Sequence, residues 1–393
     1  MIVDELRIVG STQTNVVMHA ELTRIAQRAL HRRPPEPRKE GLGQLVYPFD
    51  GELARVAVTY LRTPTRVLWD VYRSRAERLE PLYDELVADI ANDTRALWRD
   101  GDGISVEARR VEDFAAGERQ VVGTVKNALI DAVARRGKRL HVDPHRPATR
   151  WIARLDEGRP GGTRELVISI DLGGGSLSQR GWRREAGDAP LREHLAAVLV
   201  MLGRFDPRTD VLVDPMCGSG TIPIEAILLA RATPRATPAL HALGLEQAGA
   251  APLYADASPL VIGCDVELDV LAAARDNAHA AKVGDAVTWQ RCDVADLRPE
   301  MIAQIAVERG RAVPQTGLLL ANPPYGERLA DQDLEALYGV IAETCRRFRG
   351  WRAGFLVGNP LLEREFMRVL GRPRIKKPLA NANLRAYFYL YEL

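Results

Sequence analysis

The sequence lacks the features that mark several classes of protein. No apolar run approaches the roughly 20 residues that a membrane-crossing helix needs, and residues 1–10 carry charges where a secretory segment is apolar. Only four cysteines occur among 393 residues, and none has C-x-x-C spacing. We therefore expect a soluble, cytoplasmic protein whose cysteines are reduced and lie in or near the core: Cys217, Cys264, Cys292 and Cys345.

An excess of one charge and a cluster of metal ligands are also missing. Fifty-four Lys and Arg residues nearly balance 52 Asp and Glu residues, which gives a net charge of +2. His141 and His145 have the i, i+4 spacing of ligands on a helix, but Pro144 between them opposes a helix, so we expect no metal. The sequence carries no signal of oligomeric state, and a monomer is the default expectation.

One stretch departs from this charge balance. Between residues 119 and 154, nine basic residues stand against two acidic ones. Such an excess is a candidate phosphate-binding surface. Arginine outnumbers lysine throughout the chain, however, and that composition alone would give charged faces without any partner. The candidate RNA-binding residues in this stretch are Lys126, Arg135, Arg136, Lys138 and Arg139.

The length predicts two or three domains, at roughly 150 residues each. In the first half, apolar spacing predicts a mixed α+β structure. Three successive glycines within residues 171–177 lack the lysine of a phosphate loop and predict a turn between two short strands. The predicted helices cover residues 15–31, 53–61, 79–98 and 120–136, and the predicted strands cover residues 66–72, 103–109 and 166–172.

Beyond a boundary near residue 185, apolar strands alternate with helices. This order predicts a parallel, doubly wound α/β sheet that binds ligands at the carboxyl ends of its strands. Residues 232–258 form a proline- and alanine-rich insertion without an assigned role. The predicted strands cover residues 211–213, 261–264, 287–289, 317–320 and 384–393, and the predicted helices cover residues 191–202, 222–231 and 268–281.

The strand at residues 211–213 leads into Asp-Pro-Met-Cys-Gly-Ser-Gly-Thr at 214–221. Gly218 and Gly220 permit a tight turn that exposes backbone amides at a helix start. Pro223 occupies the third glycine position of the G-x-G-x-x-G pattern, which argues against a dinucleotide oxidoreductase. Asp214 would repel a pyrophosphate and attract a cation, so the loop indicates a sulfonium cofactor.

Two further acidic residues follow the next two strands. Asp265 can accept both hydroxyl groups of a ribose, and Asp293 can accept from an adenine amino group. Together with Asp214 they place three carboxylates at three successive strand ends. This pattern fits a nucleoside cofactor.

The strand at residues 317–320 leads into Asn-Pro-Pro-Tyr at 322–325. An exocyclic amine on a base is a poor nucleophile, because its lone pair is delocalised into the ring. The side-chain oxygen of Asn322 and the carbonyl of Pro323 can hold its two hydrogens and turn the lone pair toward an electrophile. Tyr325 offers a stacking face for a flipped base. A plain strand-ending turn is the alternative for this motif alone.

These residues resemble the bacterial THUMP-domain RNA guanine-N2 methyltransferases, the ribosomal RNA enzymes above all. The two motifs at 214–221 and 322–329 are similar to that family's cofactor and catalytic motifs. Residues 125–132 resemble its THUMP helix, and residues 180–183 and 189–193 resemble its interdomain junction. The resemblance covers residues 50–393.

The resemblance implies an S-adenosylmethionine-dependent class I methyltransferase domain over residues 186–393. This domain would be Rossmann-like, with a doubly wound, mostly parallel sheet and a C-terminal antiparallel strand. Residues 51–185 would form an α+β, THUMP-like RNA-binding domain, and residues 1–50 part of a ferredoxin-like subdomain. The second methyltransferase domain of the family's fused members is not expected.

The same resemblance assigns roles to single residues. Asn322, Pro323 and Tyr325 would present the base, while Asp265 would hold the cofactor's ribose and Asp293 its adenine. The residues expected to line the cofactor are Asp214, Met216, Cys217, Gly218, Gly220 and Thr221.

The expected reaction is methylation of guanine N2 in structured RNA, with 23S ribosomal RNA as the favoured substrate. Transfer RNA is an alternative, because related enzymes with the same domain pair act on it. N6-adenine methylation is another, because Asn-Pro-Pro-Tyr suits that amine too; residues 326–328 favour guanine by resemblance only. A non-catalytic RNA-binding assembly factor is the alternative from a different class, against which Asp214, Asp265 and Asn322 argue.

Overall fold

The structure is a computed structural model and describes residues 1–41, 43–156, 164–184, 191–235, 237–324, 331–381 and 384–393. The chain forms two compact units. The first comprises Met1–Gly10, His19–Leu177 and Pro234–Ala250, and the second comprises Ser11–Met18, Ser178–Thr233 and Ala251–Leu393. Residue 185, where the sequence analysis places a boundary, lies outside the described residues. Most of the 232–258 insertion is grouped with the first unit.

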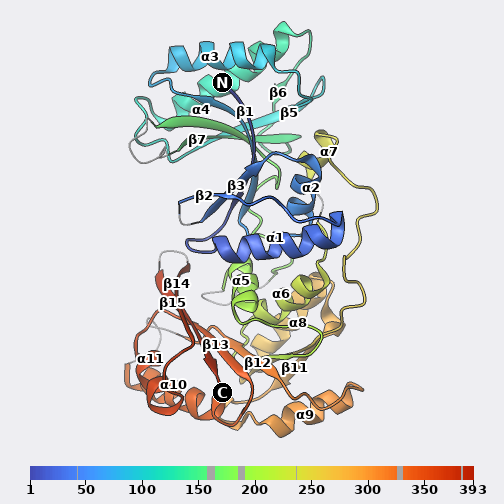
Figure 1. The fold of residues 1–393 in the computed structure, drawn as a ribbon, viewed down its shortest axis with the longest axis vertical. Helices are drawn as coiled ribbons and strands as arrows, with labels where there is room; N and C mark the ends of the chain where they lie inside the picture. Colours follow the sequence, from blue (N-terminus) through green and yellow to red (C-terminus); the bar gives the residue numbers. More distant parts are fainter. Residues whose placement is uncertain (42, 157–163, 185–190, 236, 325–330, 382–383) are drawn as a thin grey trace. The chain divides into compact units, whose positions relative to one another are not determined.

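The first unit is built on an eight-stranded sheet with the order β2-β3-β1-β4-β8-β7-β5-β6. The strands are β1 (Ile2–Val9), β2 (Arg38–Glu40), β3 (Gln44–Pro48), β4 (Arg66–Ser74), β5 (Gly103–Arg109), β6 (His141–Val142), β7 (Thr149–Asp156) and β8 (Glu165–Asp171). The helices are α1 (Asn15–Leu30), of which the part from His19 belongs to this unit, α2 (Gly51–Tyr60), α3 (Leu79–Asn92), α4 (Glu118–Arg135) and the short α7 (Pro238–Ala242). Helices α3 and α4 pack side by side, and α4 also contacts β5 and β7 (Figure 1).

Two expectations for this unit are wrong. The helix predicted over residues 79–98 ends at Asn92, because Asp93 is extended and its carboxylate binds the side chains of Tyr72 and Arg95. The glycine turn after β8 does not join two strands, since the next element along the described chain is a helix, α5 (Glu193–Leu202). The strands in residues 1–50, β6, β7 and α7 were not predicted, whereas the other predicted helices and strands are present within one to three residues.

The second unit is a doubly wound α/β layer around a seven-stranded sheet with the order β11-β10-β9-β12-β13-β15-β14. The strands from β11 to β13 pair in parallel, and β15 runs antiparallel to β13 and β14. This topology confirms the predicted fold class. The strands are β9 (Val211–Asp214), β10 (Leu260–Asp265), β11 (Val287–Arg291), β12 (Gly317–Ala321), β13 (Arg352–Val357), β14 (Ile375–Asn381) and β15 (Leu384–Glu392).

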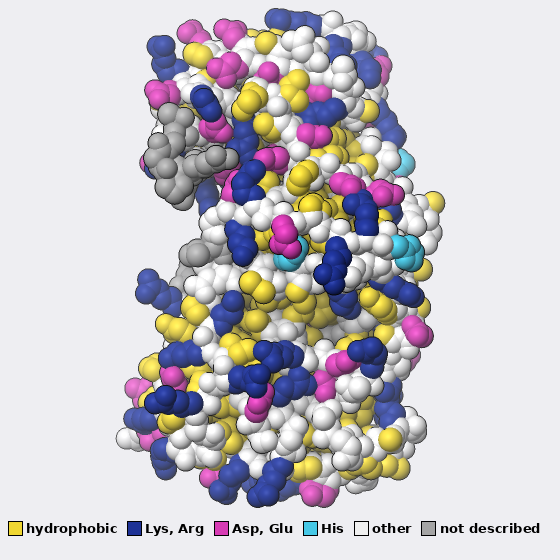
Figure 2. Space-filling view, in the orientation of Figure 1, with side chains coloured by type: hydrophobic (Ala, Val, Ile, Leu, Met, Phe, Trp, Pro, Cys, Tyr) yellow, Lys and Arg dark blue, Asp and Glu magenta, His cyan; other side chains and the backbone are white. Residues whose placement is uncertain are grey.

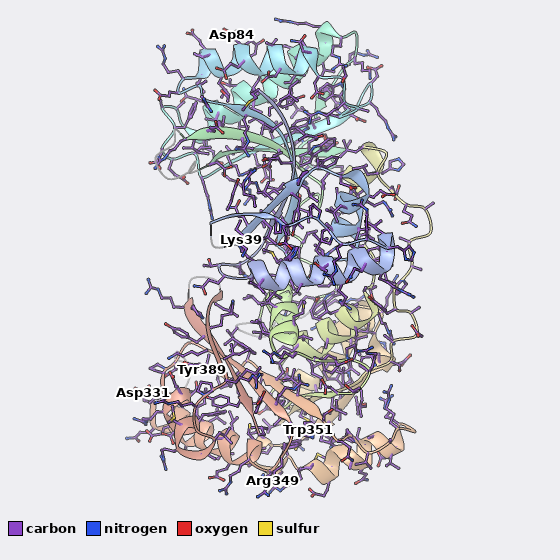
Figure 3. All side chains as sticks on the ribbon, in the orientation of Figure 1. Lys39, Asp84, Asp331, Arg349, Trp351 and Tyr389 are labelled. Carbon is purple, nitrogen blue, oxygen red and sulfur yellow. The ribbon has the colours of Figure 1, made fainter. Side chains whose placement is uncertain are left out.

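Apolar side chains cover both faces of this sheet, as expected for parallel strands. Helices α5, α6 (Thr221–Arg231) and α8 (Leu268–Ala280) contribute to the core on one face. Helices α9 (Pro299–Glu308), α10 (Asp331–Cys345) and α11 (Leu361–Val369) contribute to the core on the other (Figure 1). Tyr389 on β15 and Trp351 before β13 belong to this second core (Figure 3). The sheet is thereby held rigid, and its strand ends can position a site.

Candidate active site

The predicted cofactor loop connects the end of β9 to the start of α6. Gly218 and Gly220 have φ angles of +52° and +83°, a left-handed region in which other residues are strained. A Cβ atom on Gly220 would also lie 2.7 Å from the ring of Trp289. The N–H of Cys217 donates to the carbonyl of Cys264 at 2.8 Å, which ties the loop to the end of β10. Glycine is therefore favoured at Gly218 by backbone conformation alone, and at Gly220 by both conformation and space.

Two acidic residues stand at the ends of neighbouring strands beneath this loop. Asp214 is buried, and one of its carboxylate oxygens accepts the N–H of Met216 at 3.2 Å. Burial, with a smaller effect of Asp265, raises the pKa of Asp214 well above its usual range. Asp265 accepts the N–H of Gly218 at 3.0 Å and that of Glu267 at 3.2 Å. A buried carboxyl of this kind gains from an arriving cation, because a positive charge favours its ionised form.

The remaining predicted cofactor residues lie along the same strand ends. Asp293 is exposed after β11 and caps the turn at Val294–Asp296 by accepting the N–H of Ala295 at 2.8 Å. Met216 is half-buried against the apolar core. Cys217 is buried, and burial raises the pKa of its thiol, so it is a neutral group. Thr221 is the buried first residue of α6. The fold thus brings Asp214, the loop, Asp265 and Asp293 to one edge of the sheet.

Arg183 was not predicted from the sequence as a site residue, but its side chain binds the loop. Its guanidinium donates to the hydroxyl groups of Ser219 at 3.2 Å and Thr221 at 3.1 Å. The same group donates to the carboxylate of Glu193 and to the carbonyl of Leu191. Arg183 belongs to the junction segment identified by resemblance, but no chemistry in the sequence linked it to the loop.

A second missed residue is Asn277 on α8. It is fully buried, and its amide donates to the carbonyl of Ser219 at 3.1 Å. The signal was available in the sequence, because Asn277 lies among Leu271, Ala274 and Ala278 on the apolar face of a predicted helix. A polar side chain at such a position needs a partner, and the cofactor loop supplies it.

The predicted catalytic motif follows β12, the neighbour of β9 on its other side. Leu319 pairs with Val213, so Asn322 and Asp214 stand at the ends of adjacent parallel strands. The side-chain oxygen of Asn322 is buried and has no hydrogen-bond partner in the described part of the chain. Pro323 is buried, and the carbonyl of Pro324 accepts the hydroxyl of Tyr338 at 2.8 Å. Tyr325 and residues 326–328 lie outside the described residues.

The candidate RNA-binding residues have unequal surroundings. Lys126 is half-buried, whereas Arg135, Lys138 and Arg139 are exposed. Arg136 donates to the carbonyl groups of Ile90 and Asp93 at the end of α3, so it stabilises that helix terminus.

Positive charge does not gather in a single patch on the visible surface. Figure 2 shows Lys and Arg side chains spread over much of the visible face, lying among Asp and Glu. Arg154, at the end of the basic stretch, is buried and paired with Asp70 at 2.7 Å. The charge excess of residues 119–154 therefore overstates the cationic surface.

Three other observations bear on the expectations from composition. The four cysteines are free and buried, as predicted. Within the described residues, no three His, Cys, Asp or Glu side chains meet as a metal ligand set. None of the described helices combines the length and apolar character of a membrane span.

The strand order and the glycine loop with its acidic neighbours define a Rossmann-like methyltransferase of class I. The chain belongs to the UPF0020 family, described as "RMKL-like, methyltransferase domain", whose model matches residues 180–377. This membership confirms the methyltransferase resemblance carried by the two motifs.

The chain is similar to curated proteins named ribosomal RNA large subunit methyltransferase K/L. The relative from Chromohalobacter salexigens is 33% identical over 291 residues, which cover 68% of this chain and 37% of that protein. The chain thus spans about a third of the length of the curated relatives it matches.

Two solved structures share the fold over nearly the whole chain. A predicted N6-adenine-specific DNA methylase from Listeria monocytogenes has a TM-score of 0.74 at 24% identity, covering 99% of this chain and 96% of its own. A putative methyltransferase complexed with SAH has a TM-score of 0.75 at 22% identity, covering 99% and 98%.

Proposed function

We propose that the protein transfers a methyl group from S-adenosylmethionine to the exocyclic N2 of a guanine in structured RNA, with large-subunit ribosomal RNA as the substrate. The observation that carries this proposal is the buried side-chain oxygen of Asn322, which has no hydrogen-bond partner among the described residues and stands at a strand end beside the cofactor loop. A buried acceptor without a donor costs free energy unless a ligand supplies the hydrogen. The names of the curated relatives support ribosomal RNA as the source of that ligand.

The residues around the glycine loop fit S-adenosylmethionine. Gly220 leaves no room for a side chain, which keeps the backbone open to a ligand at the start of α6. Asp214 is a buried carboxyl whose ionised form a sulfonium would favour, and Asp265 and Asp293 provide acceptors for ribose and adenine. When bound, the cofactor supplies an electrophilic methyl group on sulfur. A solved relative of the same fold was complexed with SAH.

Asn322 and Pro323 would position the nucleophile. Each offers an oxygen that accepts one N–H of an exocyclic amine, which turns the nitrogen lone pair out of conjugation and toward the methyl group. Nitrogen takes the methyl group with its own lone pair and releases a proton afterwards, so no strong base is needed before transfer. The bond from Tyr338 to the Pro324 carbonyl holds the end of this segment in place.

The first unit is proposed as a THUMP-like RNA-binding domain. Exposed Arg135, Lys138 and Arg139 at the end of α4 support this role, because cationic side chains at a helix end can contact the phosphate backbone. Substrate choice would then come from the first unit and chemistry from the second. The catalytic motif alone does not separate guanine N2 from adenine N6, nor ribosomal from transfer RNA.

The decisive test is methyl transfer from labelled S-adenosylmethionine to protein-free ribosomal RNA and, separately, to bulk transfer RNA. The products are digested and identified by nucleoside mass spectrometry. We expect N2-methylguanosine in the ribosomal pool, and a loss of kcat of about 10²- to 10³-fold in Asn322→Ala with little change in SAH affinity. N6-methyladenosine would overturn the base assignment, and methylation of transfer RNA alone would overturn the substrate assignment.

The same pair of proteins tests the non-catalytic alternative. If Asn322→Ala abolished methyl transfer yet fully rescued a deletion phenotype, the protein would act by binding RNA. Isothermal titration of SAH into both proteins is the control, because unchanged affinity shows that the cofactor site of the variant is intact.

A further inference from the structure

The first unit contains a cavity of about 500 Å³ that the proposed reaction does not use. Its lining includes Asp102 and Gly103 at the start of β5, His141 on β6, and the loop residues that lead into β7. The volume lies in the range of small-ligand sites. All of the lining residues belong to the first unit, so the cavity is a feature of that unit alone.

Gly103 lies in the lining, close to the side chains of His141 and Asp143. It pairs in parallel register with His141, and a Cβ atom on Gly103 would lie 3.0 Å from Cβ of Asp143 and 3.1 Å from Nε2 of His141. Any larger residue would displace those two side chains. Glycine at position 103 therefore leaves space for the side chains of His141 and Asp143 beside the cavity.

The carboxylates at the cavity are bound to the backbone. Asp143 accepts the N–H groups of His145 at 3.0 Å and Arg146 at 2.9 Å, which folds the loop back on itself. Asp102 accepts the N–H of Arg99 at 2.7 Å. In the described residues the hydrogen bonds of both carboxylates thus come from backbone N–H groups and not from side chains of the cavity.

Those donors are two imidazoles and two guanidinium groups. His141, His145 and Arg146 are exposed, and within the described chain their side chains make no hydrogen bond or ion pair. Arg150 forms a long ion pair with Glu107 at 3.7 Å. Guanidinium groups suit phosphate oxygens, and imidazole rings can stack on bases. The chemistry of the lining thus matches a nucleotide.

The cavity also continues the basic end of α4. The N–H of Arg139 donates to the side chain of Asp100 at 2.8 Å, and the carbonyl of Arg139 accepts the N–H of Gly101 at 2.8 Å. Exposed Lys138 and Arg139 are thereby fixed beside the loop that lines the cavity. A polyanion that crosses this helix end can extend into the cavity, whereas a free nucleotide would make no use of these charges.

We propose that the cavity binds one unpaired nucleotide of the RNA substrate, with its phosphate at Arg146 and Arg150 and its base against His141 and His145. The assignment rests on the proposed function for its choice of RNA over other polyanions. It adds a recognition site that lies outside the methyl-transfer site and explains why the first unit carries both a cationic helix end and a cavity.

The test measures the affinity of the full chain for a short, fluorescent, single-stranded RNA of mixed sequence by anisotropy, over a series of salt concentrations. Arg146→Gln with Arg150→Gln removes the phosphate donors. We expect a loss of affinity of about tenfold or more, and a salt slope smaller by about 0.7 for each phosphate that the protein no longer neutralises. Ala148→Phe fills the cavity without changing its charge and should also weaken binding about tenfold or more.

Arg33→Gln with Arg78→Gln is the matched control. It removes the same charge from exposed positions of the same unit, one after the end of α1 and one before the start of α3. Its affinity should stay within about twofold of the unmodified protein. SAH affinity and thermal unfolding show whether each variant is folded.

Equal losses in the cavity and control variants, or no loss in Ala148→Phe, would overturn the proposal in favour of general surface charge. Competition by guanosine monophosphate at the affinity of the RNA itself would make this a small-molecule site and overturn the RNA assignment. Unmodified protein that methylates RNA while the cavity variants bind it normally would reject this site and leave the proposed function standing. Unmodified protein that neither binds nor methylates RNA would reject both.

Discussion

The side chain of Asn277 joins two segments that are distant in sequence. Its amide nitrogen donates to the carbonyl of Ser219, and its oxygen accepts the N–H of Arg184 at 2.9 Å. Arg183, one residue earlier, donates to the Ser219 hydroxyl. Ser219 is thus held through both its backbone and its side chain, and the glycine loop receives its shape from α8 and from the segment that precedes α5.

Arg183→Met should weaken cofactor binding. Removing the guanidinium leaves the hydroxyl groups of Ser219 and Thr221 without their donor, so the loop loses the fixed geometry that its amides need. We expect the Kd for SAH to rise about tenfold, which corresponds to about 1.4 kcal/mol. Isothermal titration measures this. Arg183→Lys, which keeps the charge and one donor group, should recover part of the affinity.

The kinetic parameters distinguish positioning from a general loss of structure. KM for the methyl donor should rise with the Kd in Arg183→Met, while kcat stays within about threefold. A variant whose thermal unfolding and kcat both collapsed would contradict a specific role at the loop. Asn277→Ala provides an independent check, because it removes the hydrogen bond to the backbone carbonyl of Ser219, whereas Arg183→Met removes the bond to its hydroxyl.

Asp214→Asn should change how stability depends on pH. The folded-state pKa of Asp214 is raised above its ordinary value of 3.8, so the folded protein retains a proton that the unfolded chain releases. The contribution of Asp214 to stability is therefore highest below pH 3.8, the ordinary pKa, and falls as the pH rises toward the folded-state pKa. Urea unfolding over a pH series should show this fall in the unmodified protein and a smaller one in Asp214→Asn.

The same substitution should weaken cofactor binding, because a neutral amide does not attract a sulfonium. SAH lacks that charge, so its affinity should fall less than the affinity of S-adenosylmethionine. An equal loss for both ligands would contradict an electrostatic role for Asp214.

Gly263→Ala tests the close packing behind the loop. A Cβ atom at Gly263 would lie 2.6 Å from the ring of Trp289 and 3.3 Å from the sulfur of Cys217. Because the backbone there is not left-handed, any cost is steric, and we expect a loss of about 1–3 kcal/mol in the free energy of unfolding. Adding Trp289→Leu should recover part of that loss.

Gly123→Ala is the matched control for this prediction. Gly123 lies within α4, and a Cβ atom there would meet nothing within 4 Å. Replacing it should stabilise the protein by about 0.5–1 kcal/mol, because alanine restricts the unfolded chain more than glycine does. If both substitutions changed the free energy of unfolding in the same direction, steric packing would not explain the effect of Gly263→Ala.

Asp70→Asn should strongly destabilise the first unit. Asp70 is buried and accepts from Arg154 at 2.7 Å and Arg7 at 2.8 Å, both of which are buried too. Losing the carboxylate removes the fully buried counter-ion that both guanidinium groups share, and leaves them with the less buried Asp156 and, for Arg7, Glu40. Breaking such a network costs about 3–5 kcal/mol, measurable by chemical unfolding at neutral pH.

The pH dependence of the unmodified protein provides a second measurement. Burial by itself raises the pKa of Asp70, but Arg154 and then Arg7 outweigh it and lower the pKa to about 2. The stability from this carboxylate is present above its ordinary value of 3.8 and is lost as pH falls toward about 2. Asp70→Asn should therefore show a weaker acid dependence than the unmodified protein over that range.

Helices and strands were predicted correctly where one local sequence pattern, such as an apolar run that ends at a glycine turn, was unambiguous. The strand before Asp214 and the helix after Gly220 were predicted because an apolar run ends at a glycine turn, and the structure has them as β9 and α6. The predicted helix over residues 79–98 failed at its end, because Asp93 leaves the helical conformation to bind Tyr72 and Arg95. Those partners are remote in sequence or follow the break, so helical periodicity carries no trace of them.

The sequence by itself predicted the residues of the proposed methyl-transfer site. Asp214 and Asp265 directly follow predicted strands, Asp293 and Asn322 lie a few residues beyond two others, and the ends of parallel strands share one sheet edge. The tertiary structure decided what supports and surrounds that chemistry. It brought Arg183 and Asn277 to Ser219, buried Arg154 beside Asp70, and gathered residues from three strands around a cavity. These contacts depend on packing between distant segments, which no local pattern of residues encodes.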